Sequence, residues 1–322
     1  MKTVLCLLGG ALLLSQVVSG AQSPKPVKVA LVKNAFSGSR EEAELSPGPD
    51  ALERGGLAEM LVKLGCDVAP PRNVRLAAGQ EKAYGAWQRV ALANGHLGNL
   101  VAESLKEGRF PVGLLANCNG LLGMLAGLQH AGPGNRPLKV GLVYIDAHAD
   151  FNTPETTLSG MLGGMPVAIS AGLCLTRLRQ QSGIDPALPF SSIVLAGVRD
   201  VDPLEQELLD RCRIEMIPTA DLRGPLAKVH EQMKRLTNLT DLIYIHIDMD
   251  VLDPNEVAGH PLTVAGGPSS RDLAQALTAT FRYRKAAALG IASYPADRDK
   301  DKVSLRAAYA LIEGAIRGIQ AR

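Results

Sequence analysis

An apolar run that ends in alternating polar side chains constrains this chain more than any other feature. Residues 140–145 read Val-Gly-Leu-Val-Tyr-Ile, a short run that is typical of a buried strand. Asp146, His148 and Asp150 follow at alternate positions, so in an extended segment all three side chains point the same way. We therefore expect a strand that delivers two carboxylates and one imidazole to a single place.

A second stretch repeats this design later in the chain. Residues 242–247, Leu-Ile-Tyr-Ile-His-Ile, run directly into Asp248 and Asp250. Two strands that each end in alternating acids indicate one shared site, because clustered carboxylates cannot all stay ionised unless a cation neutralises them. A pair of divalent metals is the simplest explanation. Helix caps or surface charges at the strand ends are the less favoured alternative.

The rest of the chain alternates apolar and amphipathic segments, as βα units do. The pattern predicts strands at residues 27–32, 66–69, 111–115, 140–145, 193–197, 214–217, 242–247 and 286–292, and helices at residues 50–64, 83–107, 120–129, 165–173, 203–212, 219–236, 270–284 and 300–320, with loops at residues 34–49 and 70–80. This order predicts an α/β fold with a mostly parallel sheet that helices cover on both faces. Ligands of such sheets bind at the carboxyl ends of the strands, where Asp146 and Asp248 begin.

Length and composition allow one large α/β domain or two ordinary ones. The chain has 322 residues with 46% hydrophobic content, and no linker divides residues 22–322, so we expect a single domain there. Lys and Arg number 34 against 32 Asp and Glu, which leaves no basic surplus for binding nucleic acid. We therefore expect no nucleic-acid partner.

The first residues are typical of a secretory signal. Lys2 precedes an apolar stretch that is too short to span a bilayer, and small residues stand at Ser19 and Ala21. We predict a signal peptide at residues 1–21 and a secreted or periplasmic location for the mature chain. No later stretch stays apolar over the ~18 residues that a membrane helix needs, so we expect no membrane partner after signal removal.

Four cysteines follow that segment, and none belongs to a Cys-x-x-Cys pair. They stand at Cys66, Cys118, Cys174 and Cys212, mostly among apolar neighbours. This spacing indicates neither a thiolate metal site nor a disulfide scaffold, and it leaves the redox state of these cysteines open. The acidic cluster, in contrast, is a hard, oxygen-rich ligand set that suits Mn²⁺, with Zn²⁺ or Fe²⁺ as alternatives.

Three segments together resemble the arginase branch of the ureohydrolase family. They are residues 146–168, residues 197–203 (Gly-Val-Arg-Asp-Val-Asp-Pro) and residues 248–254 (Asp-Met-Asp-Val-Leu-Asp-Pro), and the resemblance covers most of the mature chain. It implies a three-layer α/β/α fold and a homo-oligomer, often a trimer or hexamer. It also implies two Mn²⁺ ions per chain, which hold a bridging hydroxide that hydrolyses a guanidino compound to urea and an amine.

The resemblance assigns roles to the acidic residues one by one. Asp146 and Asp248 match the ligands that bridge the two metals, and His148 with Asp250 matches the remaining ligands of one metal. Asp150 matches a ligand of the other metal, and it also matches the group thought to relay a proton to the leaving amine.

The family's substrate loop is present as well. Asn152 and Ser159 match positions that hold the carboxylate of an amino acid, while Asp202 and Glu205 match positions around its ammonium group. These matches favour an α-amino-acid substrate over a decarboxylated amine such as agmatine. Asp202 and Glu205 have a structural alternative, since they could simply cap the helix that follows Pro203.

Three positions depart from the family pattern. Asn119 stands where the first metal's histidine is expected, Gly163 where a proton-shuttling histidine is expected, and Ser293 where a glutamate grips the guanidinium. An amide oxygen is a weaker ligand than an imidazole, so we expect Asn119 to hold its metal loosely. Losing the glutamate removes a charge-assisted hydrogen bond worth about 1.5 to 3 kcal/mol, which makes arginine itself a less certain substrate.

Two histidines could compensate. His260 falls where the family contacts substrate, and we hypothesise a catalytic role that partly replaces one lost group, against the alternative of a plain loop residue. His246 shares the face of Asp248 in a regular strand, so it either supports the site from behind or is a packed core histidine. The sequence thus predicts a binuclear metal hydrolase acting on a guanidino amino acid. The alternatives are hydrolysis of another amidino or formimino acid, and a weakened member that binds ligand or metal without turnover.

Overall fold

A parallel β-sheet forms the centre of the molecule. The computed structural model describes residues 26–38, 44–134, 136–257 and 259–322, so the predicted signal peptide at residues 1–21 lies outside the described residues. In the described part of the chain, the sheet has nine strands in the order β2-β1-β4-β9-β8-β5-β6-β7, with β3 also paired to β1. The strands are β1 (Lys28–Asn34), β2 (Asp67–Val68), β3 (Arg72–Asn73), β4 (Phe110–Leu115), β5 (Val140–Ile145), β6 (Ile193–Ala196), β7 (Glu215–Ile217), β8 (Leu242–Asp248) and β9 (Ala286–Ala292).

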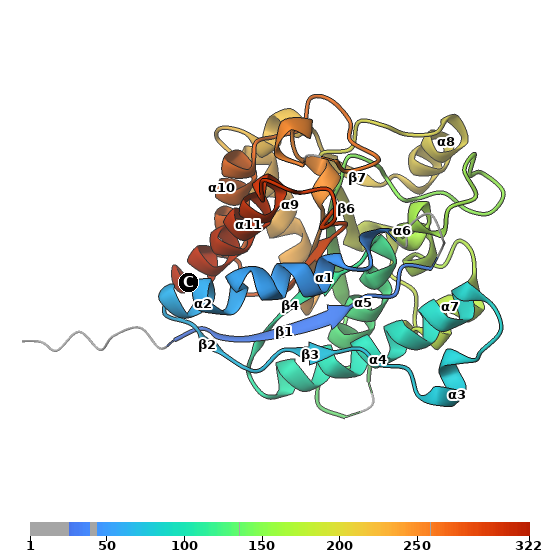
Figure 1. The fold of residues 1–322 in the computed structure, drawn as a ribbon. Coiled ribbons are helices and arrows are strands. Elements are labelled where there is room, and N and C mark those ends of the chain that lie inside the picture. Colours follow the sequence, from blue (N-terminus) through green and yellow to red (C-terminus); the bar gives the residue numbers. More distant parts are fainter. Residues whose placement is uncertain (1–25, 39–43, 135, 258) are drawn as a thin grey trace, which may run out of the picture.

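Helices cover both faces of this sheet (Figure 1). Helices α1 (Gly48–Leu52), α2 (Ala58–Lys63), α9 (Ala227–Leu239), α10 (Ser270–Thr280) and α11 (Val303–Gln320) pack on one face, and α4 (Ala86–Lys106), α5 (Leu121–Gln129), α6 (Pro166–Ser170), α7 (Thr176–Gln181) and α8 (Pro203–Cys212) pack on the other. All recorded strand pairs are parallel. The predicted three-layer α/β/α fold is confirmed.

Alternation along each strand produces two separate cores. In β5, Val143 and Ile145 join the cluster beneath α9, α10 and α11, whereas Leu142 and Tyr144 join the cluster beneath α4 and α5. Successive side chains of a strand point to opposite faces, so a strand that is buried on both faces is apolar throughout. This is why β4 and β5 are continuous apolar runs with every residue buried.

Several predicted elements differ in detail from the structure. The predicted helix over residues 50–64 is interrupted by a π-helical turn at Glu53–Leu57, where Gly56 has a φ of 104°. The predicted helix over residues 219–236 begins with a 3-10 turn at Thr219–Leu222, and α9 starts only at Ala227. The short elements β3, α3 (Ala78–Glu81) and α7 were not predicted, because two to six residues carry too little periodicity to identify. Among the described residues, no helix is both long and apolar enough to cross a membrane.

Candidate metal and active site

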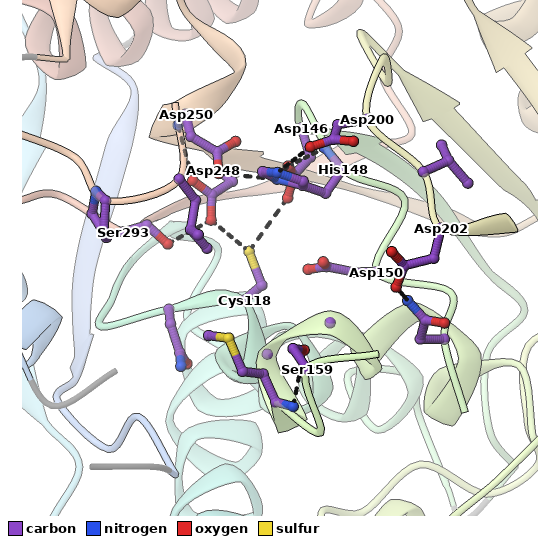
Figure 2. Close-up of a pocket in the computed structure, with 18 of the residues that line it drawn as sticks. Cys118, Asp146, His148, Asp150, Ser159, Asp200, Asp202, Asp248, Asp250 and Ser293 are labelled. Atoms are coloured by element: carbon purple, nitrogen blue, oxygen red, sulfur yellow. Dashed lines mark hydrogen bonds and ion pairs between the residues drawn. The ribbon is translucent and has the colours of Figure 1, made fainter. Parts of the chain in front are cut away.

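The two acidic strand ends lie side by side in the sheet. β5 and β8 pair in parallel from Val140 with Leu242 to Ile145 with Ile247, so Asp146 and Asp248 emerge together at the carboxyl edge. β9 and β4 continue the sheet beyond β8, and they bring Ser293 and Cys118 to the same edge. Figure 2 shows these side chains converging on one space.

His148 and Asp250 complete one side of the cluster. The Nδ1 atom of His148 lies 3.3 Å from Oδ1 of Asp146 and 3.1 Å from Oδ2 of Asp250. Asp248 begins the 3-10 turn η7 (Met249–Val251), and its Oδ1 accepts a hydrogen bond of 2.9 Å from the Asp250 backbone N–H. This turn places Asp250 beside Asp146 instead of further along the strand. Ligand atoms of Asp146, His148 and Asp250 therefore lie within 4.8 Å of one another.

Asp150 is placed by a turn and not by strand alternation. Its φ is +47°, in the left-handed region, so the chain leaves the extended conformation there and the predicted strand alternation does not place its side chain. The Tyr144 hydroxyl donates a hydrogen bond to Oδ2 of Asp150. The Asp150 carboxyl still faces the same space, on the side away from Asp250 (Figure 2).

These groups lie at the bottom of a pocket of about 450 Å³. Among the predicted site residues, Asp146, His148, Asp150, Asn152, Ser159, Asp202, Glu205, Asp248, Asp250 and His260 line it, together with Gly163 and Ser293. Leu45, Leu158, Met161 and Leu262 add an apolar wall. A mostly apolar pocket with convergent polar groups at its base is typical of a small-molecule site.

Burial and crowding govern the charge of the cluster. Burial opposes ionisation of Asp146, but hydrogen bonds and the charge of His148 outweigh it and lower the pKa of Asp146 to about 2. Burial and the charge of Asp146 raise the pKa of Asp248 to about 7, and they raise the pKa of Asp150 and Asp250 well above the usual range. Burial disfavours the charged form of His148, yet its hydrogen bonds to Asp146 and Asp250 raise its pKa to about 12. The raised pKa values show that crowding opposes ionisation of three of the four carboxyl groups, and a bound cation would favour their ionised forms.

The substrate-loop residues form a connected network at the pocket wall. Asn152 Nδ2 donates to Oδ2 of Asp202 over 3.1 Å, and Oδ1 of Asn152 accepts from the Thr156 hydroxyl. Glu205 is only 3% exposed and accepts from the backbone N–H groups of Phe151, at 2.7 Å, and Asp202. Glu205 thus holds the start of α8 against the loop, which is the capping alternative, while its side chain also lines the pocket.

The remaining loop positions are simpler. Ser159 is exposed at the pocket mouth and accepts the Met161 backbone N–H at 3.2 Å. Gly163 contributes no side chain to the wall. Ser293 has a φ of +65° and donates its hydroxyl to Oδ2 of Asp248, so its hydroxyl is directed to the acidic cluster.

The structure does not bring Asn119 to the acidic cluster. Asn119 Nδ2 donates to the Ser37 carbonyl over 2.9 Å, and the residue does not line the pocket. Its neighbour Cys118 takes that place, with Sγ 2.9 Å from Oδ2 of Asp248 and 3.7 Å from Oδ2 of Asp146. Cys118 and Asn119 are neighbours in the turn η3 (Cys118–Gly120), and their side chains point in different directions. An assignment that is wrong by one residue therefore selects the side chain that faces away from the site. Sequence reasoning missed Cys118 because a single cysteine carries no spacing signal.

Two histidines lie close to the cluster. The Nδ1 atom of His260 accepts the Leu262 backbone N–H over 3.2 Å, and its Nε2 lies 3.8 Å from Oδ1 of Asp248 without a hydrogen-bond partner. Burial lowers the pKa of His260 to about 4, so the ring is neutral at pH 7 and carries its proton on Nε2. His246 is fully buried behind the site, with Nε2 3.3 Å from the Cys118 sulfur.

Asp200 is a further polar residue that sequence reasoning did not assign. It lines the pocket, and its Oδ2 lies 3.9 Å from Nε2 of His148, on the opposite side of the ring from Asp146. This separation is too long for a hydrogen bond, so Asp200 flanks the His148 ring without fixing its orientation. Its position in the 197–203 motif was the available signal.

The donor groups present fit divalent metal ions. Three groups of side chains each bring ligand atoms within 4.8 Å: Cys118, Asp146 and Asp248; Asp146, His148 and Asp250; Asp248, Asp250 and His260. Asp146, Asp248 and Asp250 each belong to two of these groups, as residues shared between neighbouring ions would. The neutral His260 ring has no lone pair free on Nε2, so it fits a hydrogen-bond donor better than a ligand.

Comparisons with known proteins agree with this geometry. An arginase of Bacillus caldovelox is 29% identical to this chain over 256 residues, 77% of this chain and 83% of that protein. The crystal structure of an arginase from Bacillus subtilis superposes with a TM-score of 0.79 and 23% identity, and covers 90% of this chain and 98% of that one. A formimidoylglutamase from Bacillus subtilis shares the fold, with a TM-score of 0.70 and 16% identity over 93% of this chain and 88% of that one. The model of the arginase family matches residues 28–316, and the chain belongs to this family, as its three motifs predicted.

Proposed function

We propose that this protein is a binuclear metal hydrolase that cleaves a C–N bond of an amino acid with a terminal amidino-type group. A guanidino amino acid that yields urea is the first candidate substrate. One observation carries the proposal: the carboxylates of Asp146 and Asp248, from neighbouring strands, meet at the base of a pocket together with His148 and Asp250. Membership of the arginase family supports the same reaction class.

Two divalent ions per chain would be held by the shared carboxylates of Asp146 and Asp248. His148 and Asp250 would complete one position, and Mn²⁺ is the first candidate there because its ligands are carboxylate oxygens and one imidazole. Such ions supply hydrolases with a water molecule that is acidic enough to act as a nucleophile at neutral pH. His148 must lose its proton to bind, and the positive charge of a bound ion would favour that loss.

His260 and Asp150 are placed to handle hydrogen bonds and protons around the reacting carbon. His260 presents a fixed N–H toward the cluster, because its Nδ1 is already occupied by the Leu262 N–H. It can donate to an oxygen that gains negative charge during the reaction. Asp150 also lines the pocket, and the Tyr144 hydroxyl orients one of its oxygens. Its free oxygen can pass a proton to the leaving nitrogen.

The outer wall supports recognition of an α-amino acid. The carboxylate of Asp202 can receive an ammonium group, and the amide of Asn152 and the hydroxyl of Ser159 can donate or accept near a carboxylate. The hydrogen bond between Asn152 and Asp202 holds these two side chains at a defined separation before substrate arrives. Preorganised polar groups of this kind lower the entropic cost of binding.

Ser293 broadens the range of acceptable head groups. Its hydroxyl is directed to Asp248, so this wall offers no free carboxylate to a guanidinium. A pocket without that charge discriminates less between a guanidino group and a smaller formimino or amidino group. The fold is shared with a formimidoylglutamase, which keeps a formimino acid as the alternative substrate.

A protein that binds metal or ligand without turnover is the second candidate function. Both Cys118 and Ser293 donate to the same oxygen of Asp248, which ties up one bridging carboxylate in the metal-free arrangement. If these hydrogen bonds persist, the pocket binds a ligand but does not activate water.

Product release from a substrate panel distinguishes the two. The full chain, loaded with Mn²⁺, is incubated with L-arginine, N-formimino-L-glutamate, a guanidino acid that lacks the ammonium group, and agmatine, and urea and ammonia are measured. Turnover that disappears in Asp146→Asn, and persists in a matched Asp221→Asn variant at an exposed site outside the pocket, supports the hydrolase. Ligand binding by calorimetry without turnover supports the second candidate.

Assembly and location stay proposals from sequence. We expect a homo-oligomer, trimer or hexamer, which sedimentation measures directly. Residues 1–21 are proposed as a secretory signal, and sequencing the N-terminus of the mature chain tests the cleavage after Ala21.

A further inference from the structure

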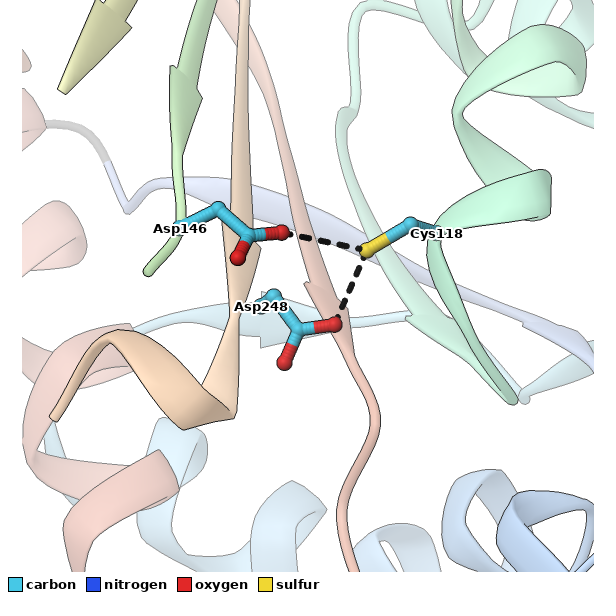
Figure 3. A group of neighbouring side chains, drawn as sticks. All are labelled: Cys118, Asp146 and Asp248. Atoms are coloured by element: carbon cyan, nitrogen blue, oxygen red, sulfur yellow. Dashed lines mark hydrogen bonds between the residues drawn. The ribbon is translucent and has the colours of Figure 1, made fainter. Parts of the chain in front are cut away.

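Cys118 places a sulfur between the two bridging carboxylates. It starts the turn η3 just after β4, and its thiol points at Asp146 and Asp248 (Figure 3). In Figure 2 the thiol lies on the opposite side of these carboxylates from His148. The Sγ atom lies 2.9 Å from Asp248 Oδ2 and 3.7 Å from Asp146 Oδ2. One atom from each of the three residues lies within 4.8 Å of the others, which is the spacing of ligands around one cation. All three side chains are buried.

The surroundings of the sulfur are built to hold it in place. His246 Nε2 lies 3.3 Å from Sγ, and its Nδ1 lies 2.8 Å from the Tyr244 hydroxyl. If Tyr244 donates to Nδ1, then Nε2 carries the proton and donates to the sulfur. The lack of a side chain at Gly290 leaves room for the Tyr244 hydroxyl, because a Cβ at that position would lie 2.0 Å from the hydroxyl oxygen. A donor behind a ligand atom orients it, as outer residues do around bound metals.

A second observation points to a missing group beside the same Asp248 carboxylate, at its other oxygen. His260 has a side chain that is 1% exposed, and its Nε2 has no partner while it faces Asp248 at 3.8 Å. A buried donor without a partner is costly, at about 1 to 3 kcal/mol, so it indicates a group that arrives with the ligands of the site. The space beside Asp248 is therefore shaped for atoms beyond the protein's own.

We propose that Cys118, Asp146 and Asp248 form a thiolate metal position selective for a thiophilic divalent cation of the Zn²⁺ class. Thiolate ligands favour zinc and disfavour Mn²⁺, whereas carboxylates accept both. The metal position formed by Asp146, His148 and Asp250 has no sulfur ligand, so it keeps its preference for harder cations such as Mn²⁺. The two positions of one cluster thus differ in metal selectivity, and Cys118 takes the role predicted for Asn119.

This inference rests on the metal dependence proposed above, and it adds the identity of one ligand and one metal class. Binding is a simple exchange: the S–H bond of Cys118 breaks, a metal–sulfur bond forms, and the proton passes to solvent without any change of oxidation state. Oδ2 of Asp248, which accepts that S–H in the metal-free arrangement, becomes free to bind the same cation.

Titration of the metal-free full chain with Co²⁺ tests the assignment. Co²⁺ replaces Zn²⁺ in such sites, and a cobalt–thiolate bond gives an intense charge-transfer absorption in the near ultraviolet that oxygen and nitrogen ligands do not give. Bound Co²⁺ per chain is counted in parallel. The variants are Cys118→Ser and the matched control Cys212→Ser, a half-buried free cysteine at the far end of α8. Circular dichroism checks that each variant is folded.

The band is expected in the wild type and in Cys212→Ser, and it is expected to be absent in Cys118→Ser. Zn²⁺ affinity at this position should fall at least about tenfold in Cys118→Ser, while Mn²⁺ affinity changes much less. Co²⁺ that binds the wild type without the band overturns the thiolate assignment and leaves the proposed hydrolase standing. Failure of every divalent ion to bind overturns the proposed function itself.

A measurement without any substitution covers the case in which Cys118→Ser does not fold. X-ray absorption of the Zn²⁺-loaded wild-type chain should show one sulfur among the zinc ligands. A first shell of oxygen and nitrogen alone contradicts the proposal.

Discussion

The hydroxyl of Tyr144 donates a hydrogen bond to Oδ2 of Asp150, and this contact connects the end of strand β5 to the loop that follows it. Tyr144 points to the face of the sheet opposite Ile145 and is fully buried. Asp150 reaches it only because the backbone takes a left-handed conformation at that residue. One oxygen of Asp150 is thereby fixed, and the other is left for the pocket.

Tyr144→Phe should therefore lower turnover more than it lowers stability. The substitution leaves the Asp150 oxygen unpaired, which costs about 1 to 3 kcal/mol of unfolding free energy, and it releases a carboxylate that acts in proton transfer. We expect kcat to fall about a hundredfold with a smaller change in KM. Tyr309→Phe is the matched control, since its hydroxyl donates to the Leu52 carbonyl away from the pocket. Equal kcat values for the two variants would contradict the role of Asp150.

His260→Leu should reduce activity without destabilising the fold. The substitution removes a buried N–H that has no partner, and it also removes the acceptor of the Leu262 backbone N–H, so the two effects offset and the melting temperature should change little. Activity should fall about a hundredfold if Nε2–H donates to the reacting group. Thermal unfolding and steady-state rates on one preparation measure both effects. A stable variant with wild-type kcat would contradict the proposed catalytic role of His260.

Asp202 and Glu205 should separate into a binding role and a structural role. Asp202→Asn should raise KM for an α-amino-acid substrate and leave KM for the guanidino acid that lacks the ammonium group unchanged, because only the former has an ammonium group there. Glu205→Ala should instead lower the unfolding free energy by about 1.5 to 3 kcal/mol, since Glu205 accepts two backbone N–H groups while buried. Denaturant unfolding and KM for both substrates test this division. Similar KM and stability changes in both variants would argue against it.

The metal-free protein should lose stability as pH rises from about 4 to above 7. The pKa of Asp248 is about 7 when folded against ~3.9 when unfolded, so the folded state binds more protons in this window and the unfolding free energy falls with rising pH. The pKa of His148, raised to about 12, acts in the same direction above pH 6.5. Asp146, lowered to about 2, adds stability only as pH rises from 2 to 4.

Added metal should reverse that trend, because the cation binds the deprotonated cluster. Free metal at a hundred times its Kd stabilises the folded chain by about 2.7 kcal/mol. This stabilisation should grow between pH 5 and 8. Melting temperatures with chelator and with Mn²⁺ across this range measure both slopes. A metal-free chain that is most stable at pH 8 would contradict the raised pKa of the buried Asp248 carboxyl. Asp248→Asn should flatten the metal-free slope.

The ends of the long strands could be predicted from sequence because burial on both faces leaves a strong signal. β5 and β9 have the predicted bounds, and the residue that follows β5 is the first acid of the cluster. The pairing of β5 with β8 could be inferred because parallel strands align their carboxyl ends. Both acids were therefore placed correctly at the same edge.

Backbone turns and single side chains could not be predicted in the same way. The left-handed residue at Asp150 and the 3-10 turn that carries Cys118 depend on tertiary packing and leave no period in the sequence. A motif match can be wrong by one residue at such a turn. This is why the sequence predicted Asn119, and not Cys118, as the residue that faces the metal site. The loop histidine and glutamate of the family are absent here, so only the structure could show that Ser293 turns toward Asp248.

Counting metal ions bound per chain tests the central claim most directly. The full chain and the variants Asp146→Asn, Asp248→Asn and Asp221→Asn are equilibrated with excess Mn²⁺ or Zn²⁺, dialysed, and analysed by mass spectrometry of the metals. Two ions per chain are expected in the wild type and in Asp221→Asn, with both lost or weakened in the other two variants, because each shared carboxylate serves both positions. Equal metal content in all four proteins, or none in the wild type, would contradict it.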